Sequence, residues 1–302
     1  MAATGEDASP TLRRLELSAA LRALRAGSQM TLEQVSSAIH EEFADSFSAA
    51  KLSRIESGQQ VPLPRDVSEL AKIYSIDRAE RERLIQMARD AKRRGWWQEF
   101  HKVGAHYRMY TDFESAALSM RNYESTFVPG LLQTPEYAQT VISGLNPTYA
   151  PDHIAELLAV RLKRQERLTG SDPLKLHVIF QENALRRMIG GPQIVIDQIE
   201  HLRAMAELDH ITIQIVRFDA GMYAALQVAN FVVMDFSEPS VIPTVVYMEG
   251  IFWNLFAEEQ EQKDHITAAF AEMRDQIALS PADTRNLLVD IRDRVAREIG
   301  GR

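Results

Sequence analysis

The chain has 302 residues, 45% of them hydrophobic and 25% charged, which is long enough and apolar enough for two globular domains. It contains no cysteine, which excludes disulfides, thiolate metal sites and cysteine nucleophiles and suits a reducing cytoplasm. The formal net charge of −8 is uneven, because residues 1–95 carry 15 basic against 14 acidic residues and the remainder carries 19 against 28. A near-neutral head and an acidic body permit the head to bind nucleic acid, although charge imbalance alone is weak evidence.

The first ten residues, MAATGEDASP, are predicted to be a disordered leader. They lack the basic start and the apolar run of a secretory signal. No segment approaches the roughly 20 apolar residues that a membrane span requires. We therefore expect a cytoplasmic protein that has no membrane partner.

Two helices are predicted next. Leucines at helical spacing indicate the first, from about Leu12 to Ala26, and Gly27 ends it. Thr31 and Gln34 can form a capping box for the second, which runs to about His40. The residues expected to face inward are Leu17, Leu21, Leu24, Leu32, Val35 and Ile39.

The third predicted helix is short and presents an unusual outer face. Ser48 is a good N-cap and Gly58 a good left-handed stop. If Leu52 and Ile55 are buried, a rotation of about 100° per residue places small and cationic residues on the opposite face. That face consists of Ala50, Arg54 and Ser57, with Lys51 and Ser53 at its margins.

Such a face suits the major groove of DNA. Small residues allow the helix backbone to approach closely, Arg54 can bond a guanine in bidentate fashion, and Lys51 can meet a phosphate. The alternative for an isolated helix is an ordinary solvated face. A fourth helix is expected to begin near Pro64, and a fifth is expected to be capped by Asp77 and Glu80. This order of five short helices is typical of a compact helix-turn-helix domain, here over residues 11–95, and it favours the interpretation that the third helix binds DNA.

The segments TLEQVSSAI and SAAKLSRIESGQQVP resemble the Cro/C1-type (XRE) helix-turn-helix. The shared residues are Thr31, Val35, Ser48, Ser53, Glu56, Gly58 and Pro62. The resemblance and the outer face together give the expected DNA-binding residues: Thr31, Ser48, Ala49, Ala50, Lys51, Ser53, Arg54 and Ser57.

One departure from the family pattern concerns the connection between the second and third helices. The segment HEEFADSF, residues 40–47, makes this connection several residues longer than the usual tight turn. It contains Glu41, Glu42 and Asp45, which would repel phosphate near the DNA backbone. We predict that this acidic loop points away from the phosphates or sits over a groove edge.

The remainder, residues 96–302, is predicted to be a mostly helical regulatory and dimerisation domain with a small mixed sheet. Its fold class is α+β. Residues 111–170, including FESAALSMR, are predicted to be helical, and a further helix is expected at about Pro192–Leu208. Two helices, at about Ala257–Ile277 and Pro281–Ile299, are expected to close the chain. The predicted strands are Leu174–Phe180, Ile211–Val216, Val228–Asp235 and Thr244–Met248.

The body also resembles a known type. The segments GWWQEF, FESAALSMRNYE, VPGLLQTPEYAQTV, VRLKRQERL, ENALRRMIGG and FDAGMYAALQVANFVV occur in this order. They look like the C-terminal domain, of unknown function, of actinobacterial XRE regulators of the WhiJ-like type. The resemblance implies a transcription regulator whose gene often lies beside that of a small protein of unknown function. The pair has been likened to an antitoxin and its partner.

The chain carries no recognised catalytic or phosphate-binding motif, so we expect no enzyme and no cofactor. His101 and His106 are five residues apart, which is not a one-face helical spacing, and no carboxylates cluster nearby. We therefore expect no metal site.

Two groups of residues in the body are candidates for an effector or partner pocket. The adjacent Trp96 and Trp97 could plug a domain junction, which we favour, or form a ligand cage. The second group, which is polar, could contain a purely structural Arg–Glu pair, or it could line a pocket for a small anionic or polar effector, since arginine fixes carboxylates and phosphates. The turn motif GLLQTPEY is predicted to be architectural, with Gln133 unassigned. The polar candidates are Gln133, Arg161, Arg164, Gln165, Glu182, Arg186 and Arg187.

The sequence thus favours a sequence-specific regulator that binds double-stranded operator DNA. It would act as a homodimer, because one recognition helix reads only a few base pairs. The body would receive a signal from a small effector or a partner protein. The alternative is an antitoxin-like interaction module that binds a small neighbouring protein and regulates its own operon.

Overall fold

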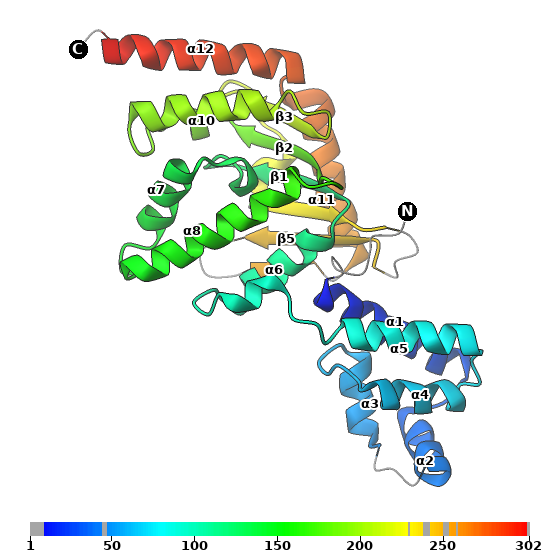
Figure 1. Cartoon of the computed structure of the whole chain (residues 1–302). Helices are drawn as coiled ribbons and strands as arrows, with labels where there is room; N and C mark the ends of the chain where they lie inside the picture. Colours follow the sequence, from blue (N-terminus) through cyan, green and yellow to red (C-terminus); the bar gives the residue numbers. More distant parts are fainter. Residues whose placement is uncertain are drawn as a thin grey trace. The chain divides into compact units, whose positions relative to one another are not determined.

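The computed structural model describes residues 9–43, 47–228, 230–237, 242–249, 254–257 and 259–300 (Figure 1). The chain divides into two compact units. The first consists of Met1–Glu99, Thr111–Ala116 and Ser237–Pro243, and the second of Phe100–Tyr110, Ala117–Phe236 and Thr244–Arg302. Most of the expected leader, residues 1–8, lies outside the described residues, whereas Ser9 and Pro10 begin the first helix.

The first unit is helical, as predicted, and most of its helix starts are fixed by local caps. Its helices are α1 (Pro10–Gly27), α2 (Leu32–Phe43), α3 (Ala49–Glu56), α4 (Pro64–Ile73), α5 (Arg78–Asp90) and the short 3-10 helix η1 (Trp96–Glu99). The predicted capping box is present, because Gln34 N donates to Thr31 Oγ1 at 3.2 Å and Thr31 N donates to Gln34 Oε1 at 2.8 Å. Asp77 caps α5 through a 2.8 Å bond from the amide of Glu80.

The predicted inward-facing residues form the core of this unit. Leu24 and Leu32 pack against that core while only partly buried. The buried members are contributed by α1 to α5, by Phe47 just before α3 and by Tyr74 just after α4. They are Leu17, Leu21, Val35, Ile39, Phe47, Leu52, Ile55, Val67, Leu70, Tyr74, Leu84, Met87 and Ala88.

The second helix is longer than predicted. It continues past His40 to Phe43, so Glu41 and Glu42 lie on its last turn, exposed, and not in a loop. The sequence offers no glycine or proline there to end the helix. Phe43 packs against the core, and the ammonium of Lys72 lies 4.9 Å from its ring centroid, which favours the extra turn. Asp45 lies outside the described residues.

The second unit combines helices with one sheet, which confirms the α+β class. Its elements begin with α6 (Ala105–Ala116), whose last residues from Thr111 belong to the first unit. The strands are β1 (Ser119–Glu124), β2 (Lys175–Gln181), β3 (Ile211–Val216), β4 (Phe231–Asp235), β5 (Thr244–Glu249) and β6 (Asn254–Phe256). The helices are α7 (Pro135–Leu145), α8 (Pro151–Gln165), α9 (Asn183–Arg186), α10 (Pro192–Met205), α11 (Gln260–Glu272) and α12 (Pro281–Gly300), with the 3-10 turns η2 (Gly130–Leu132), η3 (Glu166–Leu168) and η4 (Ala224–Gln227) and the π-helix η5 (Met273–Ile277).

The strand order is β3-β2-β1-β4-β5-β6, and the sheet is mixed. β1 pairs parallel with β2 and antiparallel with β4, so the parallel and antiparallel halves meet at β1. Tyr123, Ile179 and Val233 pack with Phe270 of α11 in one core cluster, so α11 covers that face of the sheet. At the edge of the sheet formed by β3, α12 packs along α10 and against that strand. Figure 1 shows α10 and α12 side by side.

The central strand β1 was not predicted. Residues 113–121 were expected to be helical, but the helix ends at Ala116 and the chain continues as SMRNYE in β1. Tertiary contacts override the helical propensity of this segment. Arg121 donates to Asp235 of β4 at 2.9 Å, and the buried side-chain amide of Asn122 donates to the carbonyl of Phe231 at 3.1 Å.

The other elements lie close to their predicted bounds. The strand expected from Val228 begins only at Phe231, and the short strand β6 was not predicted. The helix expected to end at Ile277 finishes in the π-turn η5. Gln214 accommodates this turn, since its side-chain amide donates to the carbonyl of Arg274 at 3.2 Å and to that of Leu279 at 2.9 Å. Among the described helices, none combines the length and apolar character that a membrane crossing requires.

Candidate nucleic-acid interface

The third helix, α3, is held against the first unit by its two buried residues. Leu52 and Ile55 are fully enclosed, as predicted. Ser48 caps the helix, because its hydroxyl accepts from the amide of Lys51 at 3.1 Å. The connection from α2 is fixed by Ser36, whose hydroxyl donates to the carbonyl of Phe47 at 2.7 Å. The start of α3 is therefore tied to α2 although the connection is long.

The opposite face of α3 is open to solvent. Arg54 lies at its centre, and its Nε donates to Gln60 Oε1 at 3.1 Å. Within the described part of the chain, the two terminal nitrogens of Arg54 have no hydrogen-bond partner, so the guanidinium keeps a fork of free donors. Ala49 is half-buried, and Thr31 is exposed at the start of α2. The exposed residues of α3 and its caps are Ser48, Ala50, Ser53, Arg54 and Ser57, as expected.

Gly58 turns the chain back along this face. Its φ of +73° lies in the left-handed region that favours glycine. A Cβ at this position would come within 3.0 Å of Leu15, so a side chain has little room. The reversal lets the amides of Gln59 and Gln60 donate to the carbonyl of Arg54 at 2.9 and 3.0 Å. It also brings the Gln60 side chain to the guanidinium.

Lys51 does not project freely at the margin, where we expected it to meet phosphate. Its ammonium lies 2.7 Å from Oδ1 of Asp66 in α4 and 4.3 Å from the ring centroid of Phe47. Asp66 is 1% exposed, and its other oxygen accepts from the amide of Leu63 at 2.9 Å. Lys51 therefore balances a buried carboxylate that also caps α4, which leaves Arg54 as the more available cation on α3.

Glu56, at the end of α3, faces inward and joins the helix to α1. Its carboxylate receives two bonds from the guanidinium of Arg25, at 2.7 Å from Nε and 2.9 Å from Nη2. The hydrogen bond from Glu56 raises the pKa of Arg25, although burial opposes the rise. Arg22 donates to the carbonyl of Glu56. The sequence indicates Glu56 only as a motif residue, because its partner Arg25 lies 31 positions away.

Three of the candidate pocket residues in the second unit come together. Gln133 Nε2 donates to the carbonyl of Val128 at 2.7 Å, and Gln133 Oε1 accepts from Nη1 of Arg161 at 2.7 Å. Gln165 Nε2 donates to the carbonyl of Gln133 at 2.8 Å. These bonds assign Gln133 to the turn that precedes α7. With Leu131 and Leu132 buried, the turn motif is architectural, as predicted.

The remaining candidates lie apart from that group. Arg164 is 5% exposed and donates to the hydroxyls of Tyr107 and Tyr110. Glu182 is buried and pairs with Arg186, which fits the structural Arg–Glu pair considered from the sequence. Its Oε2 also accepts from the amide of Phe218 at 3.0 Å. Arg187 is exposed after α9.

The two tryptophans belong to the first unit. Trp97 is buried and folds back so closely on Gly95 that a Cβ there would lie 2.0 Å from the indole ring. Trp96 is half-buried and meets Trp97 edge to face, with ring centroids 6.0 Å apart. These contacts lie within η1 and the residue that precedes it, and they do not involve the polar group around Gln133.

Comparison with known proteins finds two family models that match separate parts of the chain. A family model described as a helix-turn-helix domain matches residues 16–84. A second, described as a domain of unknown function (DUF5753), matches residues 107–290. No curated protein and no solved structure matches the chain significantly. The first match confirms the helix-turn-helix assignment and supports an XRE-like regulator.

Proposed function

The chain belongs to the family described as a domain of unknown function (DUF5753), and because it also carries a helix-turn-helix domain, we propose that it is a sequence-specific, DNA-binding transcription regulator. The observation that carries the proposal is the face of α3. A cap, two buried apolar residues and the Glu56–Arg25 pair hold this helix, while Arg54 is exposed with free donors between small side chains. This arrangement fits a helix that enters the major groove.

The finer parts of the proposal concern family type and assembly. We propose a regulator of the WhiJ-like actinobacterial type that acts as a homodimer. Two heads are needed because one short helix contacts few base pairs, and two half-sites about one helical turn apart supply adequate affinity. The second unit would hold the dimer and receive a signal, and its acidic charge would disfavour non-specific contact with DNA.

A direct test is the selection of DNA sequences from a random pool by the purified full chain. We expect a palindromic site whose half-sites are spaced by about one helical turn. An enriched site without symmetry would contradict the dimer while keeping the DNA-binding function. Recovery of no preferred sequence would contradict sequence-specific recognition.

A second candidate function is an antitoxin-like module that binds a small neighbouring protein and regulates its own operon. Exposed apolar side chains in the second unit favour it, since Phe218 is 81% and Met222 77% exposed. Such side chains on a folded surface suit a protein partner. Purification from native cells discriminates between the candidates, because a bound small protein supports the module and a bound small molecule supports a sensor.

A fragment that ends near Gly95 is expected to fold but to bind operator weakly. Its core lies between Leu17 and Ala88, so circular dichroism should show a helical domain. It lacks Asp112, which accepts from the amide of Thr11 at 2.7 Å, so some fraying at the start of α1 is expected. Gel-shift titration should show weaker binding than the full chain, because one head lacks the second half-site. Equal affinity would mean that the second unit is not the dimerising element.

Replacing Glu41 and Glu42 by serine is expected to strengthen DNA binding modestly. Both side chains are exposed on the last turn of α2, so their charges act on DNA at a distance that salt screens over about 10 Å at 0.1 M. The gain should therefore shrink as salt rises in a binding titration. A large loss of operator affinity would instead show that the end of α2 makes required contacts.

A further inference from the structure

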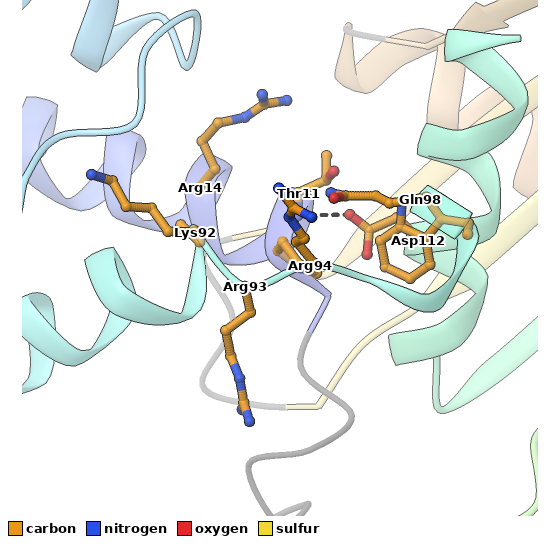
Figure 2. A pocket seen from close by; sticks show the side chains of 10 residues that line it. Thr11, Arg14, Lys92, Arg93, Arg94, Gln98 and Asp112 are labelled. Carbon is orange, nitrogen blue, oxygen red and sulfur yellow. Dashed lines mark hydrogen bonds between the residues drawn. The ribbon is translucent and has the colours of Figure 1, made fainter. Parts of the chain in front are cut away.

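A basic pocket lies within the first unit, away from the outer face of α3. It has a volume of about 290 Å³ and is lined by the start of α1, the segment after α5 and one residue of α6. Figure 2 shows its side chains: Arg14, Lys92 and Arg93 extend in different directions, and Asp112 lies beside Thr11 and Gln98. The volume is close to the lower limit of about 300 Å³ for small-molecule sites.

Positive charge dominates this pocket. Arg14, Lys92, Arg93 and Arg94 line it, and within the described chain none of them forms a salt bridge, although the charge of Arg14 also acts on Asp112. Three of these cations are consecutive and exposed. Their mutual repulsion is relieved by an anion, and arginine donors match the oxygens of a phosphate group. Arg14 also keeps its Nε buried and without a hydrogen-bond partner.

The floor of the pocket requires a hydrogen-bond donor, whereas the cations around it require an anion. Asp112 is 1% exposed, and its Oδ2 accepts from the amide of Thr11. In the described residues its Oδ1 is buried without a hydrogen-bond partner, which is costly for a carboxylate. Burial raises the pKa of Asp112, while hydrogen bonds from Thr11 and Ser9 oppose the rise. Oδ1 has almost no accessible surface, so a ligand that donates a hydrogen bond would satisfy it once the Asp112 side chain rotates toward the cavity.

We propose that this pocket binds a small phosphate ester that also carries hydroxyl or amino donors, with the phosphate on Arg14 and Arg94 and a donor on Asp112. The alternative source of phosphate is the DNA backbone. A DNA backbone offers acceptors only, in its phosphates and its deoxyribose oxygens, so it leaves Oδ1 of Asp112 unsatisfied. A ribose phosphate supplies both chemistries in a molecule small enough for the volume.

Calorimetric titration of the full chain with three probes tests the proposal. Inorganic phosphate carries only the anion, ribose only the donors, and ribose 5-phosphate both. We expect ribose 5-phosphate to bind more tightly than phosphate, and ribose not to bind. Arg14→Gln together with Arg94→Gln should weaken ribose 5-phosphate about tenfold or more, since charged hydrogen bonds are lost. Arg78→Gln, at an exposed arginine of α5 outside the pocket, is the matched control and should leave binding unchanged.

Asp112→Asn separates the second part of the site from the first. The amide keeps one oxygen for the amide of Thr11 but replaces the unpaired acceptor by a donor. Ribose 5-phosphate should then bind no better than phosphate, while the thermal midpoint without ligand shows that the fold persists. The proposal is overturned if no phosphate probe binds the wild-type chain, or if the double arginine variant binds like Arg78→Gln. Loss of operator binding in that variant, without phosphate-ester binding in the wild type, would assign the cations to DNA instead.

Discussion

Replacing Arg54 by alanine is expected to cost roughly 1–3 kcal/mol of operator binding per half-site and to relax the base preference at one position. The side chain lies at the centre of the exposed face of α3, and Gln60 holds only its Nε. The free terminal nitrogens can donate to O6 and N7 of one guanine. Titration of operator and scrambled DNA at several salt concentrations measures the effect as a loss of the ratio between the two affinities.

Arg78→Ala is the matched control, because Arg78 is also exposed on a helix of the first unit but lies on α5. It should leave the ratio unchanged. If Arg54→Ala weakens both DNAs equally, Arg54 only positions the helix, and specificity comes from Ser48, Ala49 or the shape of the DNA.

The effect of Lys51→Ala on DNA affinity would not report the loss of a phosphate contact alone. Removing Lys51 leaves the buried carboxylate of Asp66 without its cation, so the first unit should lose stability. Its effect on DNA must therefore be compared with its effect on the melting temperature. From the sequence, Lys51 is expected to contact phosphate at the margin of the helix face. Its pairing with Asp66 could not be predicted, because Asp66 lies fifteen residues later on another helix and local spacing gives no sign of the pair.

Local signals account for how well the first unit could be predicted. Helix starts at Thr31, Ser48 and Asp77 depend on hydrogen bonds that span three residues, and these are visible in the sequence. The burial of Leu52 and Ile55 follows from their spacing. What could not be predicted depends on distant contacts, such as the bond from Thr11 to Asp112 across 101 positions, which completes the pocket.

The second unit illustrates the same limit. The strand β1 lies at the centre of the sheet, yet local sequence patterns predict that the preceding helix continues into it. Pairing with its neighbours β2 and β4 makes this segment a strand. Arg161 and Arg164 lie close in sequence but serve different partners, Gln133 for the first and the tyrosines of α6 for the second. Helical spacing could indicate a shared face but not which elements would pack on it.

Glu56→Ala is expected to lower the free energy of unfolding of the first unit by about 3 kcal/mol. The carboxylate is 5% exposed and receives both bonds of the Arg25 fork, so its loss leaves a partly buried guanidinium unpaired. Arg25 keeps its bond to the carbonyl of Met30 at 3.0 Å and some contact with water, which places the cost at the lower end for a broken buried pair. Hydrogen exchange of the amides in α1 and α3 measures the loss of stability in the first unit separately from the second unit.

Glu82→Ala supplies the comparison for this prediction. Glu82 pairs with Arg78 at 2.8 Å, but both side chains are exposed, so its removal should cost at most about 1 kcal/mol. Glu56→Gln keeps the shape and one acceptor without the charge, and it should fall between the two alanine variants. If Glu56→Ala accelerates exchange in α1 and α3 no more than Glu82→Ala does, the pair with Arg25 does not hold α3 to α1. The position of α3 would then depend on Leu52 and Ile55, on the bond from Ser36 to the carbonyl of Phe47 and on the pair of Lys51 with Asp66.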